Sequence, residues 1–255
     1  KRKTIKMKLG KNIMTKNKLL VAMGALAIST SAMADLSATV TAASDYTFNG
    51  VSQTDNSPAV QGSFDYSQAS GLYAGTWASN VDFADDTNLE WDFYVGKYLE
   101  LTDTVSVDAG IAHYTYHGED GSTVNGVTIA ESSEANYSEV YAKFGFANEF
   151  GQSELNLWYA WDYFGFGGGH YIVMAAHSYE VVPGHTLRAS IDQSTSMDKD
   201  DWVWETNEES YTHYRLAYQT SLEGFDLEVA AEDTSIDADY ADARIVATVS
   251  RSFGF

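Results

Sequence analysis

The chain of 255 residues contains no cysteine and only two prolines, Pro58 and Pro183. The absence of cysteine excludes a disulfide framework and any metal site built on thiolates. Proline cannot donate a backbone hydrogen bond within a sheet, and here it falls at the start of a predicted strand and in a predicted turn. Long apolar runs are also missing: Leu19 to Ile28 is shorter than the about 20 residues that a membrane-spanning helix needs.

Cations are scarce outside the first 18 residues. Eight of the 15 Lys and Arg residues lie there, so the rest of the chain carries 7 cations against 36 acidic residues, a net charge near −29. Phosphate recognition needs clustered cations. Nucleic acid is therefore excluded as a partner, and a protein that binds to anionic lipid surfaces through its charge is disfavoured.

The beginning of the chain has the pattern of an export signal. A basic segment is followed by the apolar run and by Ala32-Met33-Ala34, a small-residue motif typical of signal-peptide cleavage. We predict a signal peptide over residues 1–34, cleaved after Ala34, with residues 1–13 as upstream translation if Met14 is the true start. The remaining residues, 35–255, have the length of one barrel or sandwich domain.

Alternation of apolar and polar residues with a period of two dominates residues 35–255. It is seen in Leu89, Trp91, Phe93 and Val95, and it predicts about twelve strands of roughly 10 residues, enough to cross a bilayer with tilt. Predicted connections are short at one end and mostly long at the other, as in outer-membrane barrels. The predicted fold is all-β: a single transmembrane antiparallel β-barrel with an up-and-down meander.

If the apolar positions face lipid, the alternate positions face the interior, because a charge facing hydrocarbon costs about 2–4 kcal/mol at the bilayer midplane. Two interpretations remain open: a filled interior in which cations and acids pair, or a narrow aqueous path with excess negative charge. Strand number does not decide between them. The predicted pore-lining residues are Glu90, Asp92, Asp108, Glu139, Asp162, Arg188 and Arg215.

Aromatic residues gather near the ends of the predicted strands, where amphipathic rings favour the membrane interface. On the side of the long loops this set includes Tyr116, Tyr163 and Tyr211. The last predicted strand ends in Phe253 and Phe255, an alternation that resembles the closing strand of outer-membrane barrels. We therefore predict that these two phenylalanines form a signal for membrane assembly.

No residue pattern indicates catalysis, a cofactor or a metal centre. His113 and His117 would lie roughly 13 Å apart on one face of a strand, too far to share an ion, and His177 and Ser178 would point to opposite faces. Loop acids at Asp85-Asp86 and at Asp198 to Asp201 lack the spacing of a calcium loop, which favours solvated loops. Bridging of lipid phosphates through divalent ions is a further hypothesis for them.

Several segments resemble one bacterial family. The segment Ser44-Asp45-Tyr46-Thr47-Phe48-Asn49-Gly50-Val51-Ser52-Gln53-Thr54, then Pro58 to Tyr66 and Gly71 to Val81, are similar to the start of the TorF-family porins, also called the Gcw_chp family. The resemblance implies an outer-membrane barrel with a transport role and brings no catalytic residues. Asn49 stands where the resemblance leads us to expect a basic residue, which removes a cation from an outer loop.

These observations predict a porin-like channel for passive diffusion of small polar solutes, with a preference for cations, in the outer membrane of a Gram-negative cell. The expected partners are outer-membrane lipid and lipopolysaccharide, the outer-membrane assembly machinery, and the solutes. No oligomeric state follows from the sequence. Two alternatives are an outer-membrane lipase or protease, and a non-conducting structural or adhesive barrel that binds through loops 117–136 and 194–209.

Overall fold

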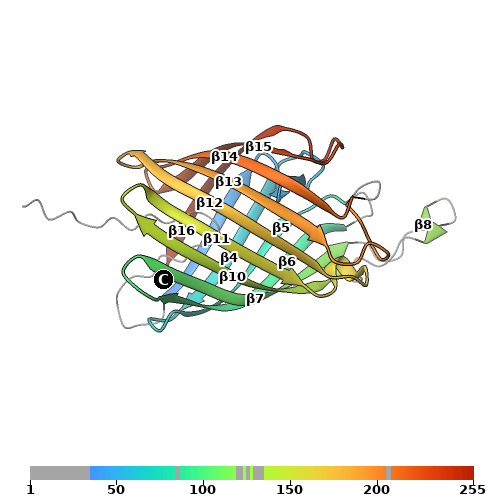
Figure 1. Ribbon diagram of the computed structural model, residues 1–255, viewed down its shortest axis with the longest axis horizontal. Helices are drawn as coiled ribbons and strands as arrows, with labels where there is room; N and C mark the ends of the chain where they lie inside the picture. The colour runs from blue at the N-terminus through green and yellow to red at the C-terminus, as the bar shows by residue number, and fades with distance from the viewer. Residues whose placement is uncertain (1–34, 84–86, 119–122, 125–126, 129–134, 205–207) are drawn as a thin grey trace, which may run out of the picture.

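The computed structural model describes residues 35–83, 87–118, 123–124, 127–128, 135–204 and 208–255 (Figure 1). The predicted signal peptide, residues 1–34, lies outside this part, as do Asp85 and Asp86. Within the described residues, no helix has the length and apolar character that crossing a membrane requires.

Twelve antiparallel strands form a closed barrel, and each pairs with the next in a meander, which confirms the predicted fold. Closure pairs the first strand with the last and leaves no sheet edge. The barrel strands have 9 to 14 residues. They are β1 (Asp35–Ala43), β4 (Ala59–Ser67), β5 (Leu72–Asn80), β6 (Thr87–Glu100), β7 (Val105–Gly118), β10 (Tyr137–Asn148), β11 (Gly151–Ala160), β12 (His170–Val182), β13 (His185–Ser196), β14 (Ser210–Leu222), β15 (Phe225–Thr234) and β16 (Arg244–Gly254).

The two ends of the barrel differ in the length of their connections, as predicted. Short turns join the strands at one end, the turn end, where Figure 1 also places the C-terminus. At the other end, the loop end, lie the longer connections, which contain two small hairpins and a 3₁₀ turn, η2 (Tyr163–Gly165). The hairpins are β2 (Thr47–Phe48) with β3 (Val51–Ser52), and β8 (Thr123–Val124) with β9 (Val127–Thr128).

The predicted alternation of faces is found in every long strand. Outward positions such as Leu89, Trp91 and Phe93 are exposed apolar residues, whereas Glu90 and Asp92 between them are buried inside. A barrel whose outer surface is apolar and whose interior is polar inverts the arrangement of a water-soluble protein and matches the requirements of a bilayer.

Three tyrosines of the inner wall each lie over a glycine directly opposite on the neighbouring strand. A Cβ added at Gly110 would lie 2.5 Å from the hydroxyl oxygen of Tyr141, and one at Gly75 would lie 2.6 Å from a ring carbon of Tyr94. Only glycine leaves room for these rings, so the pairs fix how neighbouring strands pack. The pairs are Tyr73 with Gly96, Tyr94 with Gly75, and Tyr141 with Gly110.

Candidate functional site: the barrel interior

Three acidic residues form one wall of the interior, which we call the carboxylate wall: Glu90 and Asp92 from β6 and Glu139 from β10. Their exposed fractions are 2%, 6% and 0%. Tyr116 donates to Glu90 Oε1 at 3.1 Å, and Tyr114 donates to Glu139 Oε1 at 3.0 Å.

Each acid of the carboxylate wall also has one buried oxygen without a hydrogen-bond partner: Glu90 Oε2, Asp92 Oδ1 and Glu139 Oε2. Among the described residues, the ion pairs of the barrel involve other acids. Buried carboxylates that lack a counter-ion are costly to keep charged. Such a group is neutralised by a proton or balanced by a cation, and Lys143 on the inner face of β10 is the charged neighbour of Glu139.

The opposite wall is charge-paired. Arg215 on β14 is ion-paired with Glu228 and, at 3.1 Å from its Nε, with Glu232, both on β15. His213 Nδ1 lies 2.8 Å from Asp192 Oδ2. In the circle of twelve strands β14 stands six positions from β6, so this paired wall faces the carboxylate wall across the interior.

Arg188 on β13 forms a two-pronged ion pair nearer the turn end. Its Nη1 and Nη2 donate to Glu154 Oε1 and Oε2 at 2.6 and 3.1 Å, and the two side chains are only 7% and 16% exposed. Planar pairing of this kind is the strongest geometry available to arginine and a carboxylate. The carboxyl also accepts from the Asn156 amide at 3.1 Å.

Most of the predicted pore-lining residues point inward from strands. This holds for Glu90, Asp92, Asp108, Glu139, Arg188 and Arg215. Asp108 accepts a hydrogen bond from Tyr73 at 2.5 Å. Asp162 is placed differently: β11 ends at Ala160, and Asp162 is an exposed loop residue whose carboxylate accepts from the Gly167 backbone N–H.

Tyr116, Tyr163 and Tyr211 do not belong to an interface belt, which corrects the expectation for these three residues. These rings are 2%, 4% and 3% exposed and lie inside the barrel rim. Burial raises the pKa of Tyr163 well above its usual range, so its hydroxyl stays neutral. We call the packed set the aromatic cluster; it consists of Tyr116, Tyr137, Ala160 and Tyr163 with Phe83, Tyr114, Ala135, Phe164, Trp202 and Trp204.

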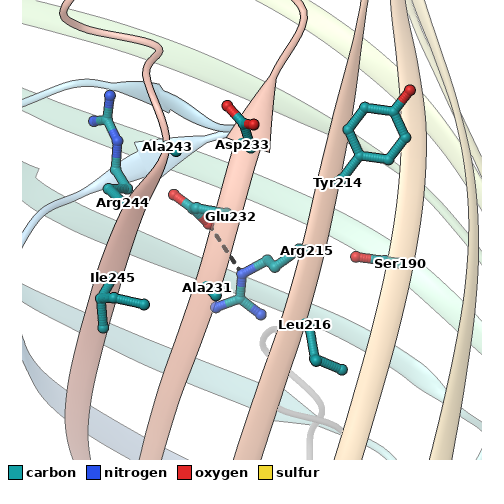
Figure 2. A pocket seen from close by; sticks show the side chains of 10 residues that line it. All are labelled: Ser190, Tyr214, Arg215, Leu216, Ala231, Glu232, Asp233, Ala243, Arg244 and Ile245. Atoms are coloured by element: carbon teal, nitrogen blue, oxygen red, sulfur yellow. Dashed lines mark hydrogen bonds and ion pairs between the residues drawn. The ribbon is translucent and has the colours of Figure 1, made fainter.

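A hollow of about 680 Å³ lies beside β14, β15 and β16, bordered by Arg215, Glu232 and Arg244 (Figure 2). Figure 2 shows Arg215 and Glu232 pointing toward each other from neighbouring strands. Arg244 is held by Asp45, with 2.8 Å between Nη1 and Oδ2. Both arginines are thus engaged, and the hollow offers no free cation to a ligand.

The described residues include three Ser–His hydrogen bonds that were not predicted from the sequence. His170 Nε2 lies 2.7 Å from Ser194 Oγ, but both residues are fully buried and His170 Nδ1 has no partner to orient the ring. The other two pairs are His113 with Ser138 and His177 with Ser153. None of the three has a carboxylate contact that would complete a catalytic triad among the described residues. Among the described residues, no group of His, Asp and Glu side chains could hold a metal ion.

Sequence reasoning missed the hairpin that carries Asn49 and the glycine–tyrosine pairs. The hairpin had a signal, because Asn-Gly between short apolar segments is typical of a tight turn. The pairs had none, since the facing residue depends on the pairing register.

The family model described as "Bacterial protein of unknown function (Gcw_chp)" matches residues 27–253. No curated protein matches the chain. Among solved structures, it is similar to the KdgM porin, with 10% identity, a TM-score of 0.56 and coverage of 85% of this chain and 99% of that one. The NanC porin gives 11%, 0.53, 84% and 97%. An outer membrane channel from Pseudomonas putida F1 gives 9%, 0.51, 89% and 97%.

Proposed function

Because the chain belongs to the Gcw_chp family and folds as a barrel similar to known porins, we propose that it is an outer-membrane channel for passive diffusion of small polar solutes, with a preference for cations. At the level of the subfamily, we propose a TorF-type porin. The observation that carries the cation preference is the carboxylate wall, whose three acids each keep a buried oxygen unpartnered.

The charge of the interior argues against anionic solutes. One KdgM structure is described as a complex with disordered oligogalacturonate, a chain of carboxylates. In this protein the interior arginines Arg188, Arg215 and Arg244 are each ion-paired, and Lys143 lies near Asp108, Glu139 and Glu154. No acid of the carboxylate wall has an ion pair within 4 Å among the described residues. Rings of Asp and Glu favour cations in channels. A polyanion would meet repulsion here, so we propose small cations and neutral polar molecules as solutes.

The proposed location brings the proposed partners. The exposed apolar belt would contact outer-membrane lipid, including lipopolysaccharide at the loop end. Phe253 lies near the end of β16 and Phe255 directly follows it; they are 45% and 78% exposed, where the assembly machinery would recognise them. We propose export through a signal peptide over residues 1–34.

Ion selectivity in planar bilayers tests the function. We expect current from the refolded protein and, in a salt gradient, a reversal potential that favours cations. Replacing the carboxylate wall by amides, with Glu90→Gln, Asp92→Asn and Glu139→Gln together, should move the reversal potential toward zero, because the uncompensated negative charge is removed.

The matched control neutralises three exposed loop acids by the same kinds of change, Asp200→Asn, Asp201→Asn and Glu208→Gln. It should leave the reversal potential nearly unchanged, because exposed charges are screened by salt. Absence of current from well-folded wild-type protein would remove the channel proposal. Equal shifts in both triple variants would show that the carboxylate wall does not set selectivity.

A further inference from the structure

The connection between β1 and β4, residues 44–58, contains a small hairpin that we call the inner hairpin. Its strands β2 and β3 pair Phe48 with Val51. The two-residue turn between them has positive φ at both positions, +49° at Asn49 and +81° at Gly50. This is the backbone of a type I′ turn, for which Asn-Gly is a preferred sequence.

The base of the inner hairpin is tied down. Asp45 Oδ1 accepts from Ser52 Oγ at 2.7 Å and from Thr54 Oγ1 at 2.9 Å. Asp45 Oδ2 is ion-paired with Arg244 of β16. These contacts hold the base of the hairpin against β16 and thereby restrict the position of its tip.

The tip reaches the paired wall. Asn49 Nδ2 donates to Asp192 Oδ1 of β13 at 2.8 Å, and Asp192 is only 2% exposed. In the strand order β13 stands four positions from β1, so the hairpin reaches a strand that is not a neighbour of β1. Gly50 lies against His213, since an added Cβ would come within 2.6 Å of the ring carbon Cδ2.

The flanks of the hairpin contact other parts of the loop end. Tyr46 packs edge-on against Trp77 of β5, with ring centroids 5.3 Å apart. Val51 packs with the buried cluster of Tyr211, Ile236 and Ala241. Trp204 also packs on that cluster and on the aromatic cluster, so the hairpin and the aromatic residues form one continuous layer.

We propose that the inner hairpin is the constriction of the channel, and that Asn49 determines the largest solute that passes by holding the tip on Asp192. This inference rests on the proposed channel function. Two further hydrogen bonds hold the hairpin behind its turn, from Thr47 to Glu232 and from the Ser52 N–H to the Tyr240 carbonyl. At the turn itself the described side-chain hydrogen bond is that of Asn49 with Asp192, so this bond is the point at which the tip is most easily released.

The test variant is Asn49→Asp, which has the same shape, tolerates positive φ, and replaces the donor by a carboxylate facing Asp192. We expect the ratio of wide to narrow dwell times in single-channel records to rise about tenfold or more, because a hydrogen bond to a charged group is lost and like charges meet. Liposome swelling should admit larger neutral sugars than the wild type admits.

Asn56→Asp is the control, because Asn56 is exposed, lies in the same loop and also has positive φ, +59°. The double variant Asn49→Asp with Asp192→Asn restores a donor opposite an acceptor and should return the wild-type record. Asp192→Asn alone corrects for its effect on His213, which contacts the same carboxylate.

The outcomes separate the two proposals. Current in the wild type with identical records for Asn49→Asp and Asn56→Asp would overturn the constriction and leave the channel standing. Current in the wild type, with a larger ratio of wide to narrow dwell times for Asn49→Asp than for Asn56→Asp, would support the constriction. If neither the wild type nor any variant carries current although all are folded, the channel function itself is removed.

Discussion

The Arg188–Glu154 ion pair gives a direct measure of how dry the interior is. Arg188→Met keeps an unbranched apolar stem but removes the guanidinium, which leaves Glu154, 16% exposed, with the Asn156 amide as its hydrogen-bond partner and Lys143 as a more distant cation. Removing one member of a buried pair costs about 3–5 kcal/mol, because the other charge stays buried and uncompensated. We expect a loss of that size in the free energy of unfolding.

Replacing both partners, Arg188→Met with Glu154→Met, should recover most of the loss, since well-packed apolar residues in place of a buried pair are often neutral or stabilising. Reversible urea unfolding in phospholipid vesicles, followed by tryptophan fluorescence, gives the free energies, and Glu154→Met completes the double-mutant cycle. The cycle isolates the coupling between the two side chains.

A loss below about 1 kcal/mol for Arg188→Met, the range of solvent-exposed pairs, would refute the reasoning. Such a result would mean that water surrounds the pair and that the interior is wider than its burial indicates.

Two further predictions concern packing and assembly. Gly110→Ala should destabilise the barrel by about 1–3 kcal/mol, because the new methyl would meet both Tyr141 and the Val95 carbonyl oxygen. Gly62→Ala, where the nearest atom lies at 3.6 Å, should be close to neutral, and equal unfolding free energies would contradict the tyrosine–glycine packing. Replacing Phe253 and Phe255 by Ser should lower the heat-modifiable, membrane-assembled fraction in cells, whereas Leu222→Ser at the same end should not; an unchanged fraction for the phenylalanine variant would end the proposed assembly role.

The barrel was predictable because the period of a strand leaves a direct trace in the residues. Leu89, Trp91 and Phe93 alternate with Glu90 and Asp92, and no tertiary information is needed to assign the two faces. The same rule misplaced Asp162, because alternation has no meaning beyond Ala160, where the strand ends.

Tyr116 and the other two buried tyrosines were assigned to the membrane interface because of their residue type, although the alternation of faces along the strand placed Tyr116 inside. Tyr116 shares the inward parity of Tyr114, yet tyrosine near a strand end is typical of the membrane interface. The packing of Phe164 on Tyr116, with ring centroids 5.0 Å apart, joins segments 48 residues apart in sequence and leaves no local trace.

Side-chain pairing inside the barrel was beyond the sequence for a related reason. Glu154 and Arg188 lie on β11 and β13, two strands apart, and their contact depends on the registers of both intervening pairings. Asn49 and Asp192 are separated by 143 residues. The Asn-Gly sequence predicts the hairpin turn, but it does not predict the contact of that turn with Asp192.

The unequal walls of the barrel have a consequence for any molecule that carries both signs of charge. Glu90 and Asp92 lie on β6, Glu139 on β10 has Lys143 as a charged neighbour, and the arginines lie on β13, β14 and β16, so the electric field inside has a component perpendicular to the barrel axis, directed toward β6. In the proposed channel, a zwitterion such as a free amino acid would turn its ammonium group toward β6 and its carboxylate toward the arginines. The charge distribution of the interior would thus set the orientation of such a solute.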